Sequence, residues 1–317
     1  MTEPHDAFLL VSFGGPEKRE DVIPFLENVL RGRNVPRERM LEVAEHYYHF
    51  GGVSPINRQN REMIEALEIE FRGHGITLPI YWGNRNWHPL LPDTVRAMRD
   101  AGVKRAIALA TSAFGSYSGC RQYRENIEAA RIAVENAPAI DKIPPFSHQA
   151  GFIEAVADRV REALAKVPSA DLVFTAHSIP ESMARTSPYE AQLREASSQV
   201  SSMTGAGEPV LVYQSRSGPP SQPWLGPDIG DFLRNTESKR LVVVPIGFLS
   251  DHMEVIYDLD TEAAAIAAER GIELVRAGTV GTHPAFVRAV REMVEGAIKH
   301  GPPPACAPDC CAPPRRG

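Results

Sequence analysis

Short apolar runs alternate along most of this chain with longer segments of helical periodicity, and this alternation restricts the possible folds more than any other feature. The runs DLVFTA and LVVV are almost wholly apolar, as in strands that are covered on both faces of a parallel sheet. The predicted strands span residues 8–13, 78–83, 105–110, 171–176, 209–213 and 240–246.

Longer segments with helical periodicity lie between and after these runs. They span residues 21–31, 38–49, 61–73, 94–102, 123–135, 151–166, 189–203, 251–269 and 284–299. Strands and helices that alternate at this spacing predict βαβ units with right-handed crossovers. We therefore expect an α/β fold in which helices flank parallel sheets.

Proline-rich stretches indicate how the chain is divided. Residues 137–150 hold three prolines, and the tail after Lys299 is interrupted repeatedly by proline, which excludes a helix or a central strand there. We predict an N-terminal lobe at 1–150, a C-terminal lobe at 151–300 and a Pro/Cys-rich tail at 301–317. Residues 215–228 form a long loop, and loops of this length are more often functional than idle.

The charge balance and hydropathy exclude several classes of protein. The formal net charge of −6 gives the chain no overall attraction to nucleic acid or to anionic lipid. The apolar run at 7–13 is too short to cross a membrane, and no basic segment precedes it. We expect a soluble, cytoplasmic protein that binds no nucleic acid.

His177 stands just beyond the predicted strand in FTAHSIPES. Ligands of open α/β sheets bind at the carboxyl ends of the strands, so a histidine there is well placed for chemistry. An imidazole also accepts a proton near neutral pH. The alternative is a loop histidine that bonds only to the backbone.

A second candidate site is the acidic segment PIGFLSDHMEVIYDLDTEAA. Glu254, Asp258 and Glu262 are spaced four residues apart, which places three carboxylates on one face of a helix. Lys and Arg are absent from 250–269, so no local cation relieves their repulsion. Hard oxygen ligands in a row suit a divalent cation, and the alternative is an exposed acidic face.

Polar and aromatic clusters follow other predicted strands and helices, at 50–60, 81–89 and 111–123. Their glycines permit a ligand to approach the backbone closely, and their aromatic rings offer flat surfaces. The candidates for binding ligand carboxylates are Arg31, Arg33, Ser54 and Tyr123. Each of them is also explained as an ordinary loop or cap residue.

The chain has four cysteines, an internal Cys120 and three in the tail, at Cys306, Cys310 and Cys311. The tail is too polar to fold alone, and thiolates so close together suggest a metal centre that Cys120 would complete. Four thiolates suit zinc and an iron–sulfur cluster equally. Free tail thiols are the alternative.

Taken together, these segments resemble the ferrochelatase family over nearly the whole chain. The resemblance rests on LLVSFGGP, GGVSPIN, FTAHSIPESM, YQSRSGPPSQPWLGPD and PIGFLSDHMEVIYDLD, in that order. It implies two Rossmann-like lobes of the chelatase type, with a porphyrin in a cleft between them. It also implies insertion of Fe²⁺ into a free-base porphyrin in haem biosynthesis.

The resemblance assigns roles to several candidates. His177 matches the family's active-site histidine, and Glu254 matches the glutamate that faces it across the cleft. Both are implied as catalytic residues and metal ligands, and Asp258 and Glu262 match the acidic row that leads from Glu254 towards solvent. Four cysteines in this pattern also match ferrochelatases that hold a [2Fe–2S] cluster.

The segments SFGGP, HYYHFGGVSPIN and SGCRQYREN look most like those of actinobacterial members, which resemble coproporphyrin III ferrochelatases that form coproheme. Arg31, Ser54 and Tyr123 fall at positions that suit the four propionates of this substrate. Phe13 stands where many relatives carry tyrosine, so a phenolate contact to iron is lost. We therefore favour coproporphyrin III over protoporphyrin IX.

Two further functions are compatible with the same segments. One is a porphyrin- or haem-binding protein without catalysis, which would not require the pairing of His177 with Glu254. The other is a chelatase for cobalt or nickel, because an acidic row does not select among divalent metals. The resemblance also allows transient contact with adjacent enzymes of the haem pathway, and we expect a monomer.

Overall fold

The structure is a computed structural model that describes residues 4–32, 35–218, 221–301, 306–307 and 309–313. Its internal contacts divide the chain into two compact units. The first comprises residues 1–111, 123–143 and 290–304, and the second comprises 112–122, 144–289 and 305–317. Each unit thus includes sequence segments that lie within the other lobe or the tail of the predicted division into 1–150, 151–300 and 301–317.

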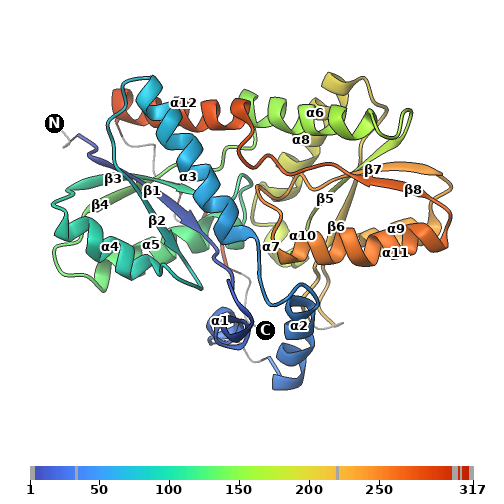
Figure 1. The fold of residues 1–317 in the computed structure, drawn as a ribbon, viewed down its shortest axis with the longest axis horizontal. Helices are drawn as coiled ribbons and strands as arrows, with labels where there is room; N and C mark the ends of the chain where they lie inside the picture. The colour runs from blue at the N-terminus through green and yellow to red at the C-terminus, as the bar shows by residue number, and fades with distance from the viewer. Residues whose placement is uncertain (1–3, 33–34, 219–220, 302–305, 308, 314–317) are drawn as a thin grey trace. The chain divides into compact units, whose positions relative to one another are not determined.

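The first unit contains a four-stranded parallel sheet (Figure 1). Its spatial order is β2-β1-β3-β4, with strands β1 (Ala7–Ser12), β2 (Ile80–Asn84), β3 (Arg105–Ala110) and β4 (Ala139–Lys142). The helices are α1 (Val22–Leu30), α2 (Arg37–His49), α3 (Ile56–Gly73), α4 (Leu91–Asp100) and α5 (Gln122–Ile132), together with most of α12 (Pro284–His300).

The second unit repeats this arrangement with the order β6-β5-β7-β8. The strands are β5 (Asp171–His177), β6 (Val210–Gln214), β7 (Arg240–Val244) and β8 (Glu273–Arg276). The helices are α6 (Ala150–Leu164), α7 (Glu181–Ala184), α8 (Tyr189–Thr204), α9 (Ile229–Asn235), α10 (Met253–Tyr257) and α11 (Ala264–Glu269).

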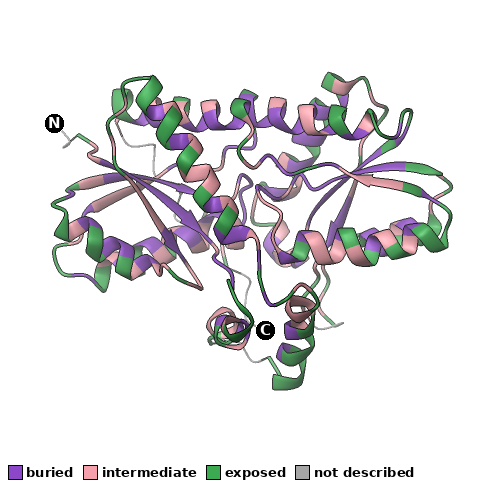
Figure 2. Ribbon diagram, in the orientation of Figure 1, coloured by how far each residue is buried: buried purple, intermediate pink, exposed green. Residues whose placement is uncertain are grey.

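The strands of both sheets are buried along much of their length (Figure 2), and their buried residues are mainly apolar. In the second unit Val173, Val212 and Val243 pack with side chains of α9, α10 and α11. Their neighbours along the strands face the other way, towards the layer that contains α6 and α8 (Figure 1). Covering both faces in this manner explains why the strands are apolar throughout, as the sequence indicated.

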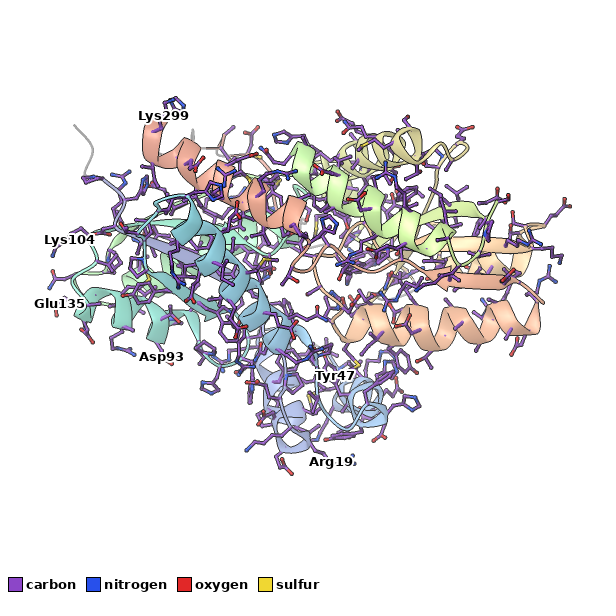
Figure 3. The ribbon with its side chains drawn as sticks, turned by 45° about the horizontal axis from the view of Figure 1, so that its top comes forward. Arg19, Tyr47, Asp93, Lys104, Glu135 and Lys299 are labelled. Carbon is purple, nitrogen blue, oxygen red and sulfur yellow. The ribbon has the colours of Figure 1, made fainter. Side chains whose placement is uncertain are left out.

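Helices α1 and α2 of the first unit form a small core of their own. Tyr47, labelled in Figure 3, lies on α2. Phe25 on α1 packs edge-on against it, with 5.8 Å between the ring centroids. Phe13, just after β1, packs against the same Phe25 ring at 6.2 Å. Packing against the Phe25 ring therefore holds the Phe13 side chain in place.

The strand order creates the same special position in both units. The chain runs from the first strand of each sheet to a neighbour on one side, and then crosses to a neighbour on the other side. Ligands of open α/β sheets bind where the order reverses, outside the carboxyl ends of the two strands concerned. These positions are the tips of β1 and β3 and the tips of β5 and β7.

Candidate active site

His177 is the last residue of β5, at the switch point of the second unit. Its carbonyl oxygen accepts a 3.0 Å hydrogen bond from the Tyr189 hydroxyl. The next residue, Ser178, donates its backbone N–H to Gln214 and its hydroxyl to Leu225, each at 2.7 Å. These bonds fix the backbone on both sides of the imidazole.

One ring nitrogen of His177 is engaged in a hydrogen bond to the backbone, and the other is available for proton transfer. Nδ1 of His177 is hydrogen-bonded to the carbonyl oxygen of Ser178. Because a carbonyl only accepts, Nδ1 carries the proton in neutral imidazole. Nε2 is therefore the atom that gains or loses a proton, and it faces Oε1 of Glu254 at 3.6 Å.

Glu254 reaches this position because the chain leaving β7 approaches the tip of β5 very closely. Gly247 donates its N–H to the Thr175 carbonyl at 3.1 Å, and a Cβ at Gly247 would lie 2.7 Å from the Ala176 Cβ. Only glycine permits this approach. The following loop leads into α10, whose second residue is Glu254.

His177 and Glu254 are paired because they come from neighbouring strand tips. Both residues belong to the second unit, and both fall within the predicted C-terminal lobe at 151–300. The crossover explains the pairing, because β6 and β7 pair on opposite sides of β5, and the chain that leaves β7 then passes the tip of β5.

The electrostatics of the pair are reciprocal. Burial acts to lower the pKa of His177, but Glu254 and the Ser178 carbonyl outweigh it and raise this pKa above 6.5. Burial acts to raise the pKa of Glu254, but His177 and His252 bring it down to about 2. The imidazole and the carboxylate side chains remain 32% and 48% exposed, so they are accessible to a ligand.

His252 is a site residue that the sequence analysis missed. It precedes α10, and its Nδ1 accepts the backbone N–H of Glu254 at 3.2 Å, which caps the helix. Burial lowers the pKa of His252, so it stays neutral at pH 7. Its adjacency to the acidic segment was visible in SDHMEV, but its capping role depends on where the helix begins.

Asp258 continues the site along the helix from Glu254. Its Oδ2 accepts hydrogen bonds from the Ser215 hydroxyl and from Gln214 Nε2, and this same Nε2 donates to the Glu254 carbonyl at 3.0 Å. Burial, with the charges of Glu254 and Glu262, raises the pKa of Asp258 to about 7 against the effect of the Ser215 bond. The three predicted carboxylates therefore interact as a row.

The row does not lie on a single α-helix as predicted, because a π-helical turn covers Asp258–Ala263. In an α-helix, residues four apart advance by about 40° around the axis, so Glu262 would be displaced by about 80° from Glu254. A π turn winds less per residue because its hydrogen bonds span five residues. Between Asp258 and Glu262 the side-chain direction therefore rotates back around the helix axis, towards the direction of Glu254. The three carboxylates thus stay in line.

The expected absence of a neutralising cation is only partly right. The sequence near the helix contains none, but Arg276 at the end of β8 binds Asp251 and Asp260. Neither of these is a member of the row. Among the described residues, no Lys or Arg figures in the causes that shift the pKa of Glu254 or Asp258.

In the first unit, Phe13 and Tyr123 are brought together by an arginine that the sequence analysis did not select. The Arg85 guanidinium lies 4.6 Å from the Tyr123 ring centroid and 5.6 Å from that of Phe13. Its Nε donates to Asn126 at 2.7 Å. Arg85 follows β2 within the polar stretch 81–89, where the clustering of polar and aromatic residues was the available signal.

The other predicted substrate residues are placed differently. Ser54 is buried and its N–H donates to the Pro16 carbonyl, which ties it to the loop after Phe13. Arg31 is exposed at the end of α1, where it bonds Asn28. Arg33 lies outside the described residues.

All four cysteines belong to the second unit. Cys310 and Cys311 have their sulfurs 3.7 Å apart, and Cys311 is only 2% exposed. Burial raises the pKa of the Cys311 thiol to about 12, with further contributions from Cys310, Cys120 and Cys306. Arg121 donates to the Cys310 carbonyl and Thr186 to that of Ala312, which holds this part of the tail on the unit.

Within the part of the chain that the structure describes, no group of three or more His, Cys, Asp or Glu side chains is arranged to hold a metal ion. For the acidic row, this means that Glu254, Asp258 and Glu262 are spaced along an axis rather than gathered around one point. For the cysteines, metal binding would require the thiols to lose their protons and draw closer.

Comparison with known proteins shows the family of the chain. The sequence model described as Ferrochelatase matches residues 5–298. The chain belongs to the ferrochelatase family. A ferrochelatase of Rhodopirellula baltica is 54% identical to it, and the alignment covers 97% of this chain and 93% of the relative.

Further ferrochelatase relatives carry a more specific name. The coproporphyrin III ferrochelatase of Frankia alni is 51% identical, with 98% of this chain and 87% of the relative covered. That of Streptomyces coelicolor is 50% identical, with 92% and 85% covered. The predicted resemblance to the ferrochelatase family and to its actinobacterial members is thereby confirmed.

Solved structures confirm the predicted fold class. The sirohydrochlorin chelatase SirB of Bacillus subtilis subspecies spizizenii, in complex with cobalt, matches with a TM-score of 0.55 at 14% identity, covering 93% of this chain and 95% of SirB. CbiX, the terminal enzyme of sirohaem biosynthesis in denitrifying bacteria, matches with a TM-score of 0.52 at 12% identity, covering 92% and 99%. These identities show a shared fold alone.

Membrane attachment was also considered. Among the described helices, none combines the length and the hydropathy that a bilayer crossing demands.

Proposed function

We propose that this ferrochelatase-family chain inserts Fe²⁺ into free-base coproporphyrin III to give coproheme. The observation that carries the proposal is the pair formed by His177 Nε2 and Glu254 Oε1, 3.6 Å apart at the sheet's switch point and continued by a row of carboxylates. Two relatives named coproporphyrin III ferrochelatase, at 50–51% identity, support the choice of porphyrin.

Metallation releases two pyrrole protons for each Fe²⁺ that enters, so the site must accept protons. His177 does so at Nε2 when it is neutral, because Nδ1 remains bonded to Ser178. Glu254 accepts the second proton or passes the metal ion to the porphyrin. A site that binds a bent macrocycle better than a flat one would expose the nitrogen lone pairs to the metal.

The row of Glu254, Asp258 and Glu262 suits a substrate ion better than a resident one. A preformed cage of three ligands would trap Fe²⁺, whereas single carboxylates in line allow a partly hydrated ion to pass from one to the next. Asp258, with a pKa of about 7, releases a proton readily when a cation arrives.

Arginine, serine and tyrosine side chains in the first unit favour a substrate with many carboxylates. Arg85 extends the predicted set of Arg31, Ser54 and Tyr123, and a guanidinium recognises a propionate through two parallel hydrogen bonds. Phe13 provides an apolar ring where a phenolate would bind metal, so iron contact there is excluded chemically. Coproporphyrin III has four propionates, whereas protoporphyrin IX has two.

The test is anaerobic turnover with Fe²⁺, comparing coproporphyrin III with protoporphyrin IX. We expect His177→Ala to abolish insertion while porphyrin binding, followed by fluorescence quenching, is retained. Glu254→Gln should lower turnover about 100-fold or more, as expected for loss of an acid–base group. The matched controls His300→Ala and Glu273→Gln alter exposed residues of the same types and should leave the rate unchanged.

Near-native rates in either active-site variant would contradict the assigned roles. A preference for protoporphyrin IX would overturn the choice of substrate but not the chemistry. Porphyrin binding without turnover by any divalent metal would indicate a binding protein instead. Faster insertion of Co²⁺ or Ni²⁺ than of Fe²⁺ would indicate a different chelatase.

We further propose that Cys120, Cys306, Cys310 and Cys311 hold a [2Fe–2S] cluster. Their thiols interact within one unit although they come from distant parts of the sequence, and four thiolates are a suitable ligand set. Such a cluster would add electron-accepting chemistry and a covalent link between tail and body. With a pKa of about 12, Cys311 binds its proton tightly, so incorporation must displace it.

Free thiols and a ferrous substrate both fit a reducing compartment, so we propose that the enzyme acts in the cytoplasm. A monomeric state and transient contact with neighbouring enzymes of the haem pathway stay predictions.

A further inference from the structure

Arg276 is the last residue of β8, and it binds two carboxylates from the acidic segment at once. Its Nε and Nη2 donate to the two oxygens of Asp260 at 2.6 and 2.9 Å, which is a bidentate pair. Its Nη1 donates to Asp251 at 2.8 Å. The guanidinium side chain is only 17% exposed, so these charge-assisted bonds are partly shielded from water.

One of the two carboxylates precedes the row of Glu254, Asp258 and Glu262 in the sequence, and the other falls within it. Asp251 immediately precedes His252, which caps α10, and Asp260 lies within the π turn. Asp260 is two residues from Asp258, and side chains at this spacing do not share a helix face. Arg276 therefore holds the segment from outside the row, at its start and near its middle.

This arrangement also divides the carboxylates of the segment into those paired with Arg276 and those in the row. Arg276 balances one of the two charges of Asp251 and Asp260, while Glu254, Asp258 and Glu262 interact with one another. The carboxylates that anchor the helix are thus paired, and those that meet the substrate ion are left available. A Lys at position 276 would neutralise charge but could not form the bidentate pair.

We propose that Arg276 is a positioning residue for metal insertion. By clamping Asp251 and Asp260, it fixes α10 and the π turn so that Glu254 stays opposite His177 and in line with Asp258. The inference rests on the proposed function, because it assigns Arg276 an effect that is exerted only through Glu254 and its row.

Steady-state kinetics on Arg276→Gln test this role. We expect kcat to fall about tenfold or more, because small misplacements of a reacting group are costly. KM for the porphyrin should stay within twofold, since the hydrogen bonds of Arg276 go to Asp251, Asp260 and the Ala277 carbonyl. The matched control is Arg240→Gln, which removes an exposed partner of Glu273 on the same pair of strands and should change neither constant.

A double-mutant cycle with Glu254→Gln separates positioning from general destabilisation. If Arg276 acts through Glu254, then adding Arg276→Gln to Glu254→Gln should lower kcat less than twofold further. Arg276→Lys should recover only part of the rate. If Arg276→Gln does not fold, as judged by circular dichroism, Asp260→Asn replaces it and should lower kcat in the same manner.

An Arg276→Gln kcat within twofold of the native value would overturn the inference. So would an equal fold-loss in the native and Glu254→Gln backgrounds, because that shows an effect independent of Glu254. Failure of the proposed function looks different. In that case His177→Ala and Glu254→Gln retain native rates, whatever Arg276→Gln does.

Discussion

The reactive nitrogen of His177 is defined by two neighbours, a carbonyl that fixes the proton on Nδ1 and a carboxylate that faces Nε2. Burial alone would lower the pKa of this imidazole, and the negative charge of Glu254 reverses the effect. The sequence predicted both residues as partners. It did not reveal that their backbones are fixed by Tyr189, Gln214 and Gly247, which are distant in sequence.

We predict that Glu254→Gln lowers the pKa of His177 in the metal-free protein from above 6.5 to below it. Burial is then no longer outweighed by the carboxylate. Proton-detected NMR of the histidine ring across pH 4–9 measures this pKa. Glu273→Gln is the control and should leave the titration in place. An unchanged or higher value in Glu254→Gln would contradict the pairing.

The same shift has a consequence for stability. Because the pKa of folded His177 lies above the ordinary 6.5, its contribution is fully present below that pH and is lost as pH rises through the raised pKa. Glu254 behaves in the opposite sense, and its contribution is lost as pH falls from 4.5 towards 2. The pair therefore stabilises the protein most between these limits, and Glu254→Gln should flatten this dependence.

At the scale of elements, the four central strands and the edge strands β2 and β6 were predictable, whereas the edge strands β4 and β8 were not. β1, β3, β5 and β7 are buried throughout most of their length and read as apolar runs. The sequence analysis missed β4 and β8, with sequences AIDK and ELVR, because these two strands have only four residues, carry charged side chains and contain no buried residue. The short helices α7 and α9 were missed as well, since four to seven residues show too little periodicity.

Gly247 determines how closely two elements approach at the site. We predict that Gly247→Ala forces the chain after β7 away from Ala176, because the new Cβ would lie 2.7 Å from that side chain. Turnover should fall at least tenfold and the melting temperature should drop. Gly296→Ala is the control, because a Cβ at that helical position meets no atom within 4 Å, and it should be neutral or stabilising.

The outcome that would contradict this reading is native turnover in Gly247→Ala. A lower melting temperature with unchanged turnover would show that the close approach supports the fold alone.

At the scale of the whole molecule, the two units share one strand order but differ in what they present at the carboxyl ends of their strands. The second unit carries the imidazole, the acidic row and the cysteines, whereas the first carries Arg85 between aromatic rings. Equal topology thus supports different chemistry, as expected when sites are built on a common fold. The tail belongs to this organisation because Arg121 and Thr186 bind its carbonyls.

The proposed cluster gives a prediction for the tail. Cys306→Ser should abolish visible absorption and iron–sulfide content in anaerobically purified protein, and should lower the melting temperature because the tail loses its link to the body. The control is Ser202→Ala, an exposed change on α8 that should preserve the spectrum. A colourless native protein that binds zinc stoichiometrically would refute the cluster.

The sequence by itself determined the α/β class, the positions of the buried strands and the chemical character of the site, because apolar periodicity and strand-end residues are local properties of the chain. The tertiary structure decided which strand tips become neighbours, and hence that Nε2 of His177 faces Oε1 of Glu254. It also decided the partners of Asp251 and Asp260, since Arg276 comes from another strand. Such long-range pairings arise from strand order and packing, which no local pattern encodes.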